Sequence, residues 1–108
     1  MQNLKDRTKL FAGNCWKLCS NIPHSREYNA FVNQLIRSSS SVGANYRVAQ
    51  RAKSKADFLN KLKIVEEEAD ESMYFLELLP EVLKENQEEI RVLHKDANGD
   101  SFYYSYFN

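Results

Sequence analysis

Apolar and small residues recur every three or four positions through two successive segments in the middle of the chain. In the second segment these positions are Phe58, Leu62, Val65, Ala69, Ser72, Met73, Leu76 and Leu79. In the first segment they are Phe31, Leu35, Ser38, Val42, Asn45, Ala49 and Ala52. A β-strand would alternate with period two, so each segment is predicted to be one face of a long helix. The pattern therefore predicts an all-α fold, an antiparallel helical bundle.

The first of four predicted helices runs from about Leu4 to Ser20 and ends before Pro23, because the residue preceding a proline disfavours helical dihedrals. Its apolar stripe comprises Leu4, Phe11, Cys15, Leu18 and Ile22, widened by Trp16 and Cys19. Ser25 is predicted to cap the second helix, which continues to about Ala52. Gly43 lies inside this helix at a cost of about 1 kcal/mol relative to alanine, which indicates close approach of a partner helix or a local bend.

The third helix is predicted to begin at the capping-box sequence Ser54-Lys55-Ala56-Asp57. Two ends are compatible with its pattern. The helix stops near Leu79 if Pro80 breaks it, or reaches Leu83 if the proline only kinks it. Either way it is on the order of 40 Å long, at 1.5 Å per residue.

A fourth helix is predicted from a cap formed by Asn86 with Glu89 and is expected to continue to Phe107. Its apolar positions are Ile90, Leu93, Ala97, Tyr104 and Phe107. Asn98-Gly99 is a turn signal inside this segment. The aromatic residues near the end favour a strand by propensity, but one strand without a partner would have nothing to pair with. We therefore expect a helix that is weakened around Gly99.

The chain has 108 residues, enough for one domain with one core, so residues 1–108 are predicted to form a single four-helix-bundle domain. Hydrophobic residues make up 43% and charged residues 28% of the sequence, which disfavours disorder. No apolar run approaches the roughly 20 residues of a membrane span, and residues 1–9 lack the apolar core of a signal peptide. We therefore expect a cytoplasmic protein with no membrane contact.

The formal charge of zero hides a strong separation along the chain. Between Arg47 and Val65 there are six basic residues and one acidic residue. Between Glu66 and Glu89 there are ten acidic residues and one basic residue. Separated poles suit contact with a polyanion, or with the opposite pole of a second copy.

Three groups of residues resemble chemical sites, but each lacks part of the pattern that such a site requires. Cys15 and Cys19 are interpreted as buried apolar residues, because a metal site that adds His24 would lack a fourth ligand. Asp96 opens a sequence that resembles a calcium loop, but its glycine comes two places early and its twelfth position is Phe107. The carboxylates between Glu66 and Glu71 lack the Glu-x-x-His motifs of di-metal bundles and are interpreted as a solvated face. Glu68, Asp70 or Glu71 is expected to form a salt bridge to the second helix.

No phosphate-binding loop, catalytic triad or Cys–His pair is present, so the sequence predicts no enzyme and no cofactor. The best functional candidates are basic. Arg47 and Arg51 are one turn apart, and Arg37 is expected to extend their row. Lys53 and Lys55 follow at the hinge, and Tyr46 could stack on an unpaired base. The alternative is that these arginines pair with the acidic third helix or with a neighbouring subunit.

Four stretches of the chain resemble a known family, namely residues 41–52, 54–58, 61–64 and 67–72. The resemblance is to the four-helix bundles named for the protein encoded in intervening sequences of bacterial 23S ribosomal RNA genes. Related members include the accessory protein of diversity-generating retroelements. The similarity spans about Leu4 to Tyr106 and is strongest from Ile36 to Leu79.

This resemblance implies an up-down-up-down bundle that assembles into a ring-like homopentamer without enzymatic activity. For the retroelement relatives it implies binding of nucleic acid and of a reverse transcriptase through a positively charged surface. Arg37, Arg47 and Arg51 match the family's basic pattern on the second helix. Pro80 and the Asn98-Gly99-Asp100 segment depart from the family pattern, and the neutral overall charge does not favour strong polyanion binding.

Two functional hypotheses follow. In the first, a non-catalytic homo-oligomer contacts RNA, DNA or a nucleoprotein partner of the reverse-transcriptase type through its basic residues. These are Arg37, Tyr46, Arg47, Arg51, Lys53 and Lys55. In the second, the protein is a structural or adaptor oligomer without nucleic-acid contact, whose basic and acidic poles meet between subunits.

Overall fold

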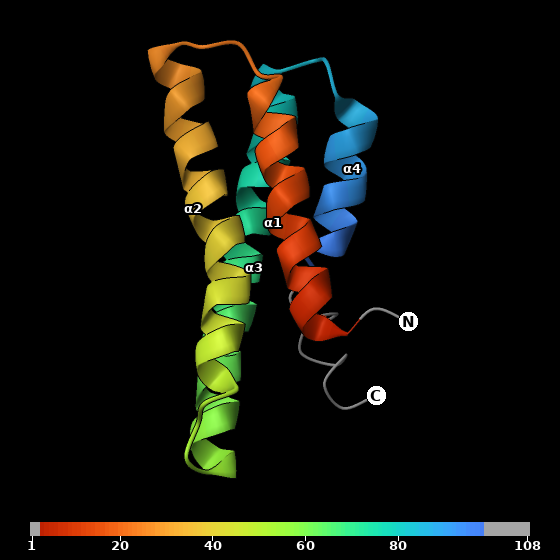
Figure 1. The fold of residues 1–108 in the computed structure, drawn as a ribbon. Coiled ribbons are helices and arrows are strands. Elements are labelled where there is room, and N and C mark those ends of the chain that lie inside the picture. Colours follow the sequence, from red (N-terminus) through yellow and green to blue (C-terminus); the bar gives the residue numbers. More distant parts are fainter. Residues whose placement is uncertain (1–2, 99–108) are drawn as a thin grey trace.

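Four α-helices form the computed structural model, which describes residues 3–98 (Figure 1). Their bounds are α1 Leu4–Ser20, α2 Arg26–Ala49, α3 Lys55–Val82 and α4 Gln87–Asp96. Helices that follow one another in the chain pack side by side, and α1 also contacts α4, which closes the bundle. The antiparallel all-α bundle expected from the apolar spacing is confirmed.

The first three helices begin at side-chain caps. Asn3, Ser25 and Ser54 each accept a hydrogen bond from the backbone N–H three residues later, at 2.8–3.0 Å. Each cap satisfies one of the amides that a helix leaves without a partner at its start. The predicted caps Ser25 and Ser54 are confirmed. Asp57 also accepts a hydrogen bond from the Lys53 backbone N–H at 3.4 Å, so the start of α3 is held from both sides.

The interface between α2 and α3 is the most extensive in the bundle, and the predicted apolar faces meet there. Its buried residues are Leu35, Ser38, Val42, Ala49, Leu62, Val65, Ala69, Ser72, Leu76 and Leu79. Ser38 and Ser72 face each other across this interface, with hydroxyl oxygens 3.0 Å apart. The hydroxyl of Ser72 also lies 2.9 Å from the Glu68 carbonyl, which satisfies its polar atom in the core. Small side chains therefore bring α2 and α3 close together.

The helices α1 and α2 also approach closely, at Gly43. A Cβ atom added to Gly43 would lie 3.1 Å from the Thr8 hydroxyl oxygen. Close helix approach, one of the two expectations for this glycine, is therefore confirmed. Trp16 was expected to widen the apolar face of α1, and that prediction is wrong because its side chain is 62% exposed.

Pro80 lies inside α3, which continues to Val82, so the longer of the two predicted ends is confirmed. Proline removes one backbone hydrogen bond from the helix. Leu76 and Leu79 before it and Leu83 after it are all buried, and this packing on both sides holds the helix together through the proline. Apolar burial thus outweighs the local preference for a helix end.

One predicted boundary is wrong, because α2 ends at Ala49 rather than near Ala52. The helix α4 ends at Asp96, close to the predicted weak point around Gly99. Asn86 is in the left-handed region with φ 62°, and its side chain bonds Glu89 instead of capping a backbone amide of α4. The remainder of the predicted fourth helix, with its aromatic tail, lies outside the described residues.

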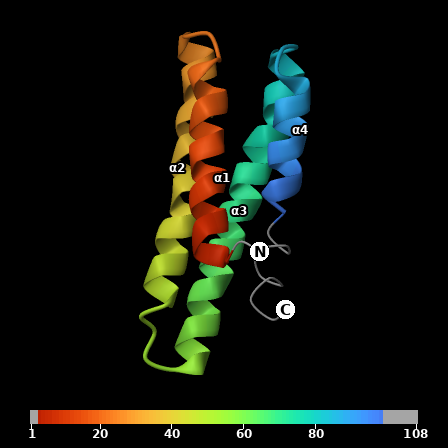
Figure 2. The ribbon, with the colours of Figure 1, turned by 45° about the vertical axis from the view of Figure 1, so that its right-hand side comes forward.

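The four helices differ in length, and this difference exposes one end of the bundle. The loop between α2 and α3 lies beyond the ends of α1 and α4 (Figures 1 and 2). We call this end, formed by residues 47–55, the hairpin tip. No helix within residues 3–98 is both long enough and apolar enough to cross a membrane.

Candidate functional site

The hairpin tip carries four of the six predicted site residues. Arg47 lies in the last turn of α2, Arg51 and Lys53 lie in the loop, and Lys55 is the first residue of α3. All four side chains are exposed. Among residues 3–98, none of the four pairs with a carboxylate. Pairing of Arg47 and Arg51 with the acidic part of α3 therefore does not occur within the described chain.

Arg37 has a different environment. Its guanidinium pairs with Glu68 at 3.4 Å and with Glu71, both on α3. The hydrogen bond to Glu71, helped by the charges of both carboxylates, raises the pKa of Arg37 above its usual value. The salt bridge expected between the second helix and one of the carboxylates of Glu68, Asp70 or Glu71 is confirmed.

Arg37 does not extend the row of Arg47 as expected. Ten residues separate them, and at 100° per residue their directions differ by about 80° around α2. Arg37 faces α3, whereas Arg47 lines a groove on the side of α1. Arg37 is therefore separated from the other basic residues both by direction and by its two carboxylate partners.

A groove between α1 and α2 brings together cations from distant parts of the sequence. We call it the basic groove; it has a volume of about 320 Å³. Its lining residues are Lys5, Thr8, Lys9, Ala12, Ser40, Gly43, Ala44, Tyr46, Arg47 and Gln50. Three of them are cationic and none carries a carboxylate. Within residues 3–98, Lys5, Lys9 and Arg47 have no ion-pair partner.

Sequence reasoning missed Lys5 and Lys9. They are one turn apart on α1 and flank the buried Thr8, so they border the apolar stripe on its α2 side. The spacing of the two lysines could have been recognised in the sequence. It indicates a shared site only once α2 is known to be the neighbour on that side. Tyr46, for which stacking on a base was predicted, also lines the basic groove, where it is half-buried and packs against the core.

Comparison with known proteins places this architecture in a family. Residues 3–99, which span all four helices, match the 23S rRNA-intervening sequence protein family. The chain belongs to this family. A solved structure of a protein of unknown function from the S23 ribosomal protein family of Bacteroides thetaiotaomicron VPI-5482 is similar, with 33% sequence identity and a TM-score of 0.81. The match covers 92% of this chain and 94% of that one. No curated protein matches the chain.

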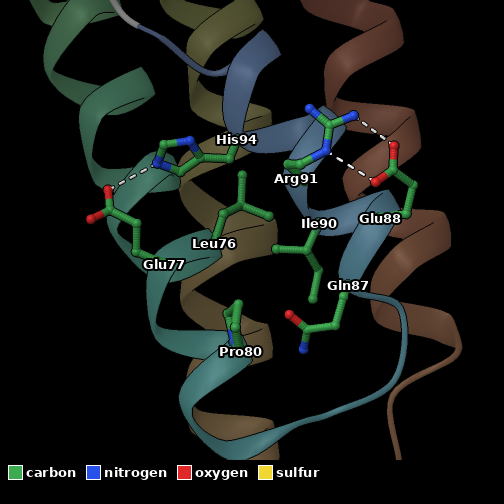
Figure 3. A pocket seen from close by; sticks show the side chains of 8 residues that line it. All are labelled: Leu76, Glu77, Pro80, Gln87, Glu88, Ile90, Arg91 and His94. Carbon is green, nitrogen blue, oxygen red and sulfur yellow. Dashed lines mark hydrogen bonds and ion pairs between the residues drawn. The ribbon is translucent and has the colours of Figure 1, made fainter.

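A second cleft of this family member lies between α3 and α4, with a volume of about 410 Å³ (Figure 3). Leu76, Pro80 and Ile90 contribute apolar surface to its lining. Four of its polar side chains form two pairs, His94 with Glu77 at 3.1 Å and Arg91 with Glu88 through two hydrogen bonds, and Gln87 donates a hydrogen bond to the Leu83 carbonyl. These pairs tie α4 to α3 and stabilise α4 internally, and they present no nucleophile with an adjacent base.

The two cysteines are buried and free, which confirms their interpretation as core residues. Burial raises the pKa of Cys15 from about 9 to about 12, and burial with the nearby Glu89 charge raises that of Cys19 to about 11. Thiolates, not thiols, attack electrophiles and bind metals. Both cysteines are therefore poor nucleophiles and poor ligands at neutral pH.

Metal binding has little support in the part of the chain that is described. Across residues 3–98 no three His, Cys, Asp or Glu side chains are grouped to hold a metal ion. Glu77 and His94 supply two candidate ligands, fewer than a zinc site requires. The segment that resembles a calcium loop begins at Asp96 and continues outside the described residues.

Proposed function

We propose that this member of the 23S rRNA-intervening sequence protein family binds nucleic acid as a non-catalytic helical bundle. The contact is made by the basic groove together with the hairpin tip. The observation that carries the proposal is the convergence of Lys5, Lys9 and Arg47 on a groove without a carboxylate. Lysine and arginine side chains with free donors bind phosphate oxygens, and such contacts position a nucleic acid without reading its sequence.

The neutral net charge of the chain does not oppose this function. At physiological ionic strength, salt largely screens interactions between exposed charges farther apart than about 8 Å, so a phosphate responds mainly to the nearest cations. Most carboxylates lie on α3 beyond Val65 and around α4, whereas the cations of the groove and tip lie on α1, the end of α2 and the start of α3. The basic surface therefore acts as a local binding site on a neutral molecule.

The test is binding of labelled single-stranded and double-stranded RNA and DNA, measured by fluorescence anisotropy across a series of salt concentrations. The logarithm of affinity should fall linearly with the logarithm of salt. Replacing Lys5, Lys9 and Arg47 together by glutamine should reduce that slope by up to about 3, one unit for each lost phosphate contact. Absence of binding to all four nucleic acids at low salt would overturn the proposal.

A matched control removes three charges elsewhere. Lys17, Lys84 and Lys95 are exposed and line no part of the basic groove. Their combined replacement by glutamine changes the net charge by the same amount as the groove variant. The control should bind nearly as tightly as the unaltered protein. Equal losses in both variants would show that only net charge matters, and the groove would lose its assignment.

A second function, self-association, is favoured by exposed apolar side chains on α2 and α3. Val48, Ile64 and Val82 are 41–51% exposed. Val82 also lines an apolar hollow of about 470 Å³ with Ala30, Tyr28 and Phe31. A second copy is the occupant that the charge distribution favours. The basic residues of the hairpin tip of one molecule complement the acidic residues between Glu66 and Glu89 of another.

Light scattering tests this assembly. The homopentamer that the family resemblance implies would have five times the 12.6 kDa mass of the chain. Substituting both Ile64 and Val82 by aspartate should lower the measured mass, whereas the same change at exposed Asn29 and Asn60 should not. A monomeric mass for the unaltered protein would exclude the structural oligomer. The reverse transcriptase implied by the retroelement relatives stays a prediction, to be tested by co-purification.

A further inference from the structure

The side chain of Trp16 is a large aromatic group on the surface, 62% exposed, in a helix whose other large apolar residues are mostly buried. It is the single tryptophan of the chain. An exposed indole leaves much apolar area in water, which is unfavourable unless the ring meets a partner. The position of this ring relative to the basic groove suggests what that partner is.

Trp16 continues the row of residues that α1 contributes to the basic groove. Lys5, Lys9 and Ala12 line the groove, and Trp16 follows Ala12 by four residues. Steps of four, three and four residues keep side chains on one stripe of a helix. Trp16 therefore stands at the α2-facing edge of α1, about 10 Å along the helix from Lys9 at 1.5 Å per residue.

The groove between the cations and the tryptophan is lined by small side chains. Ala12 comes from α1, and Ser40, Gly43 and Ala44 come from α2. Trp16 lies beyond Ala12 along α1, on the side of the groove away from Lys5 and Lys9. The stripe thus presents a cationic end, a small-residue middle and an aromatic end.

We infer that the basic groove and Trp16 together form a site for single-stranded nucleic acid, in which a base stacks on the indole while Lys5, Lys9 and Arg47 hold the adjoining phosphates. This inference rests on the proposed function and narrows it to unpaired strands. Stacking on an aromatic side chain requires an open base face, which a continuous duplex does not offer. A combination of a basic groove with an aromatic platform is typical of proteins that bind single strands.

Fluorescence of Trp16 gives a direct test, because no other tryptophan contributes. Titration with a short single-stranded RNA or DNA should quench this fluorescence in proportion to binding. The same strand annealed to its complement should bind more weakly and leave the fluorescence nearly unchanged. Binding of single strands without a change in Trp16 emission would overturn the inference.

Variants separate stacking from charge. Trp16→Ala should weaken single-strand binding by about 10- to 100-fold, as measured by anisotropy of a labelled strand, and should leave duplex binding unaltered. Trp16→Phe keeps an aromatic face and should restore most of the affinity. Because the side chain is exposed, neither variant should change the thermal unfolding midpoint much.

The outcomes distinguish this inference from the function on which it rests. If the Lys5, Lys9 and Arg47 variant loses binding but Trp16→Ala does not, phosphate binding stands and stacking is wrong. If Trp16→Ala instead lowers the mass in light scattering, the indole belongs to a contact between copies and the inference is also wrong. If no nucleic acid binds at all, both the proposed function and the inference fail.

Discussion

At the scale of single residues, contacts across the α1–α2 interface limit which side chains fit. Gly43 faces the hydroxyl of Thr8, whereas Gly13 on α1 has no atom within 4 Å of a Cβ built on it. Both glycines lie inside helices, where alanine is favoured by about 1 kcal/mol. Substitutions at the two positions therefore distinguish the effect of intrinsic helix propensity on stability from the effect of packing.

We predict that Gly13→Ala raises the free energy of unfolding by about 0.5–1 kcal/mol. Gly43→Ala should raise it less, because its new methyl group meets Thr8 at 3.1 Å and must displace it. Gly43→Leu should lower it by about 2 kcal/mol or more through overpacking. Urea denaturation measures all three variants, and an equal gain from both alanines would contradict the close approach of α1 and α2.

Cys15 and Cys19 give a pH dependence whose sign is fixed by burial. Their folded pKa values, about 12 and about 11, lie above the ordinary value near 9. The unfolded chain therefore ionises first, so the stability that these thiols contribute is complete below about pH 9 and declines as the pH rises toward the folded values.

We predict that the free energy of unfolding, measured by urea denaturation under reducing conditions, falls by about 1 kcal/mol per thiol between about pH 9 and pH 10. Cys15→Ala should be less stable than the unaltered protein at all pH values and should show a shallower decline. A decline of the same steepness in this variant would assign the effect to other groups, such as lysines and tyrosines.

Sequence patterns predicted the roles of single residues correctly where the interaction involves only neighbours in the chain. The caps Ser25 and Ser54 act on amides three residues away, so their own neighbourhood decides them. Trp16 was predicted to widen the apolar face, but its position is rotated by about 100° around α1 from that of the buried Cys15. Whether such a border residue is covered depends on a neighbouring helix, not on α1.

At the scale of elements, Pro80 is the position where local preference and packing conflict. Because proline donates no backbone hydrogen bond, the carbonyl of Leu76 loses its usual partner four residues later. The buried residues on either side, Leu79 and Leu83 among them, keep α3 helical to Val82. The spacing of apolar residues was compatible with both predicted ends of this helix. Only the packing of α3 against α4 and α2 decided between them.

We predict that Pro80→Ala raises the free energy of unfolding by about 1–3 kcal/mol, because a helix-compatible residue restores the missing hydrogen bond. Pro80 is exposed, so little packing is lost with its ring. The matched change Pro23→Ala, in the loop between α1 and α2, should not stabilise the protein. Thermal and urea denaturation provide the readout, and destabilisation by Pro80→Ala would show that the α3–α4 cleft requires the ring.

At the scale of the whole molecule, the bundle sorts its basic residues into two groups. Arg37 is neutralised by Glu68 and Glu71 across the α2–α3 interface. The cations of the basic groove and hairpin tip have no such partners within residues 3–98. The family resemblance treated Arg37, Arg47 and Arg51 alike, and the tertiary contacts divide them.

We predict that Arg37→Gln leaves nucleic-acid affinity and its salt slope nearly unchanged, whereas Arg47→Gln lowers both. Arg37→Gln should also change the thermal midpoint little, because exposed ion pairs contribute weakly. Anisotropy and calorimetry on the two variants check these outcomes. A larger loss of binding from Arg37→Gln than from Arg47→Gln would place the contact surface on the α2–α3 side.

The sequence by itself determined the helices and the faces that they bury, because a period of three to four residues and local caps depend on neighbours in the chain. It also separated the charges along the chain. Only the tertiary structure decided which cations act together. Lys5 and Lys9 meet Arg47 some forty residues away because Gly43 lets α1 and α2 approach closely, and no local pattern encodes that distance.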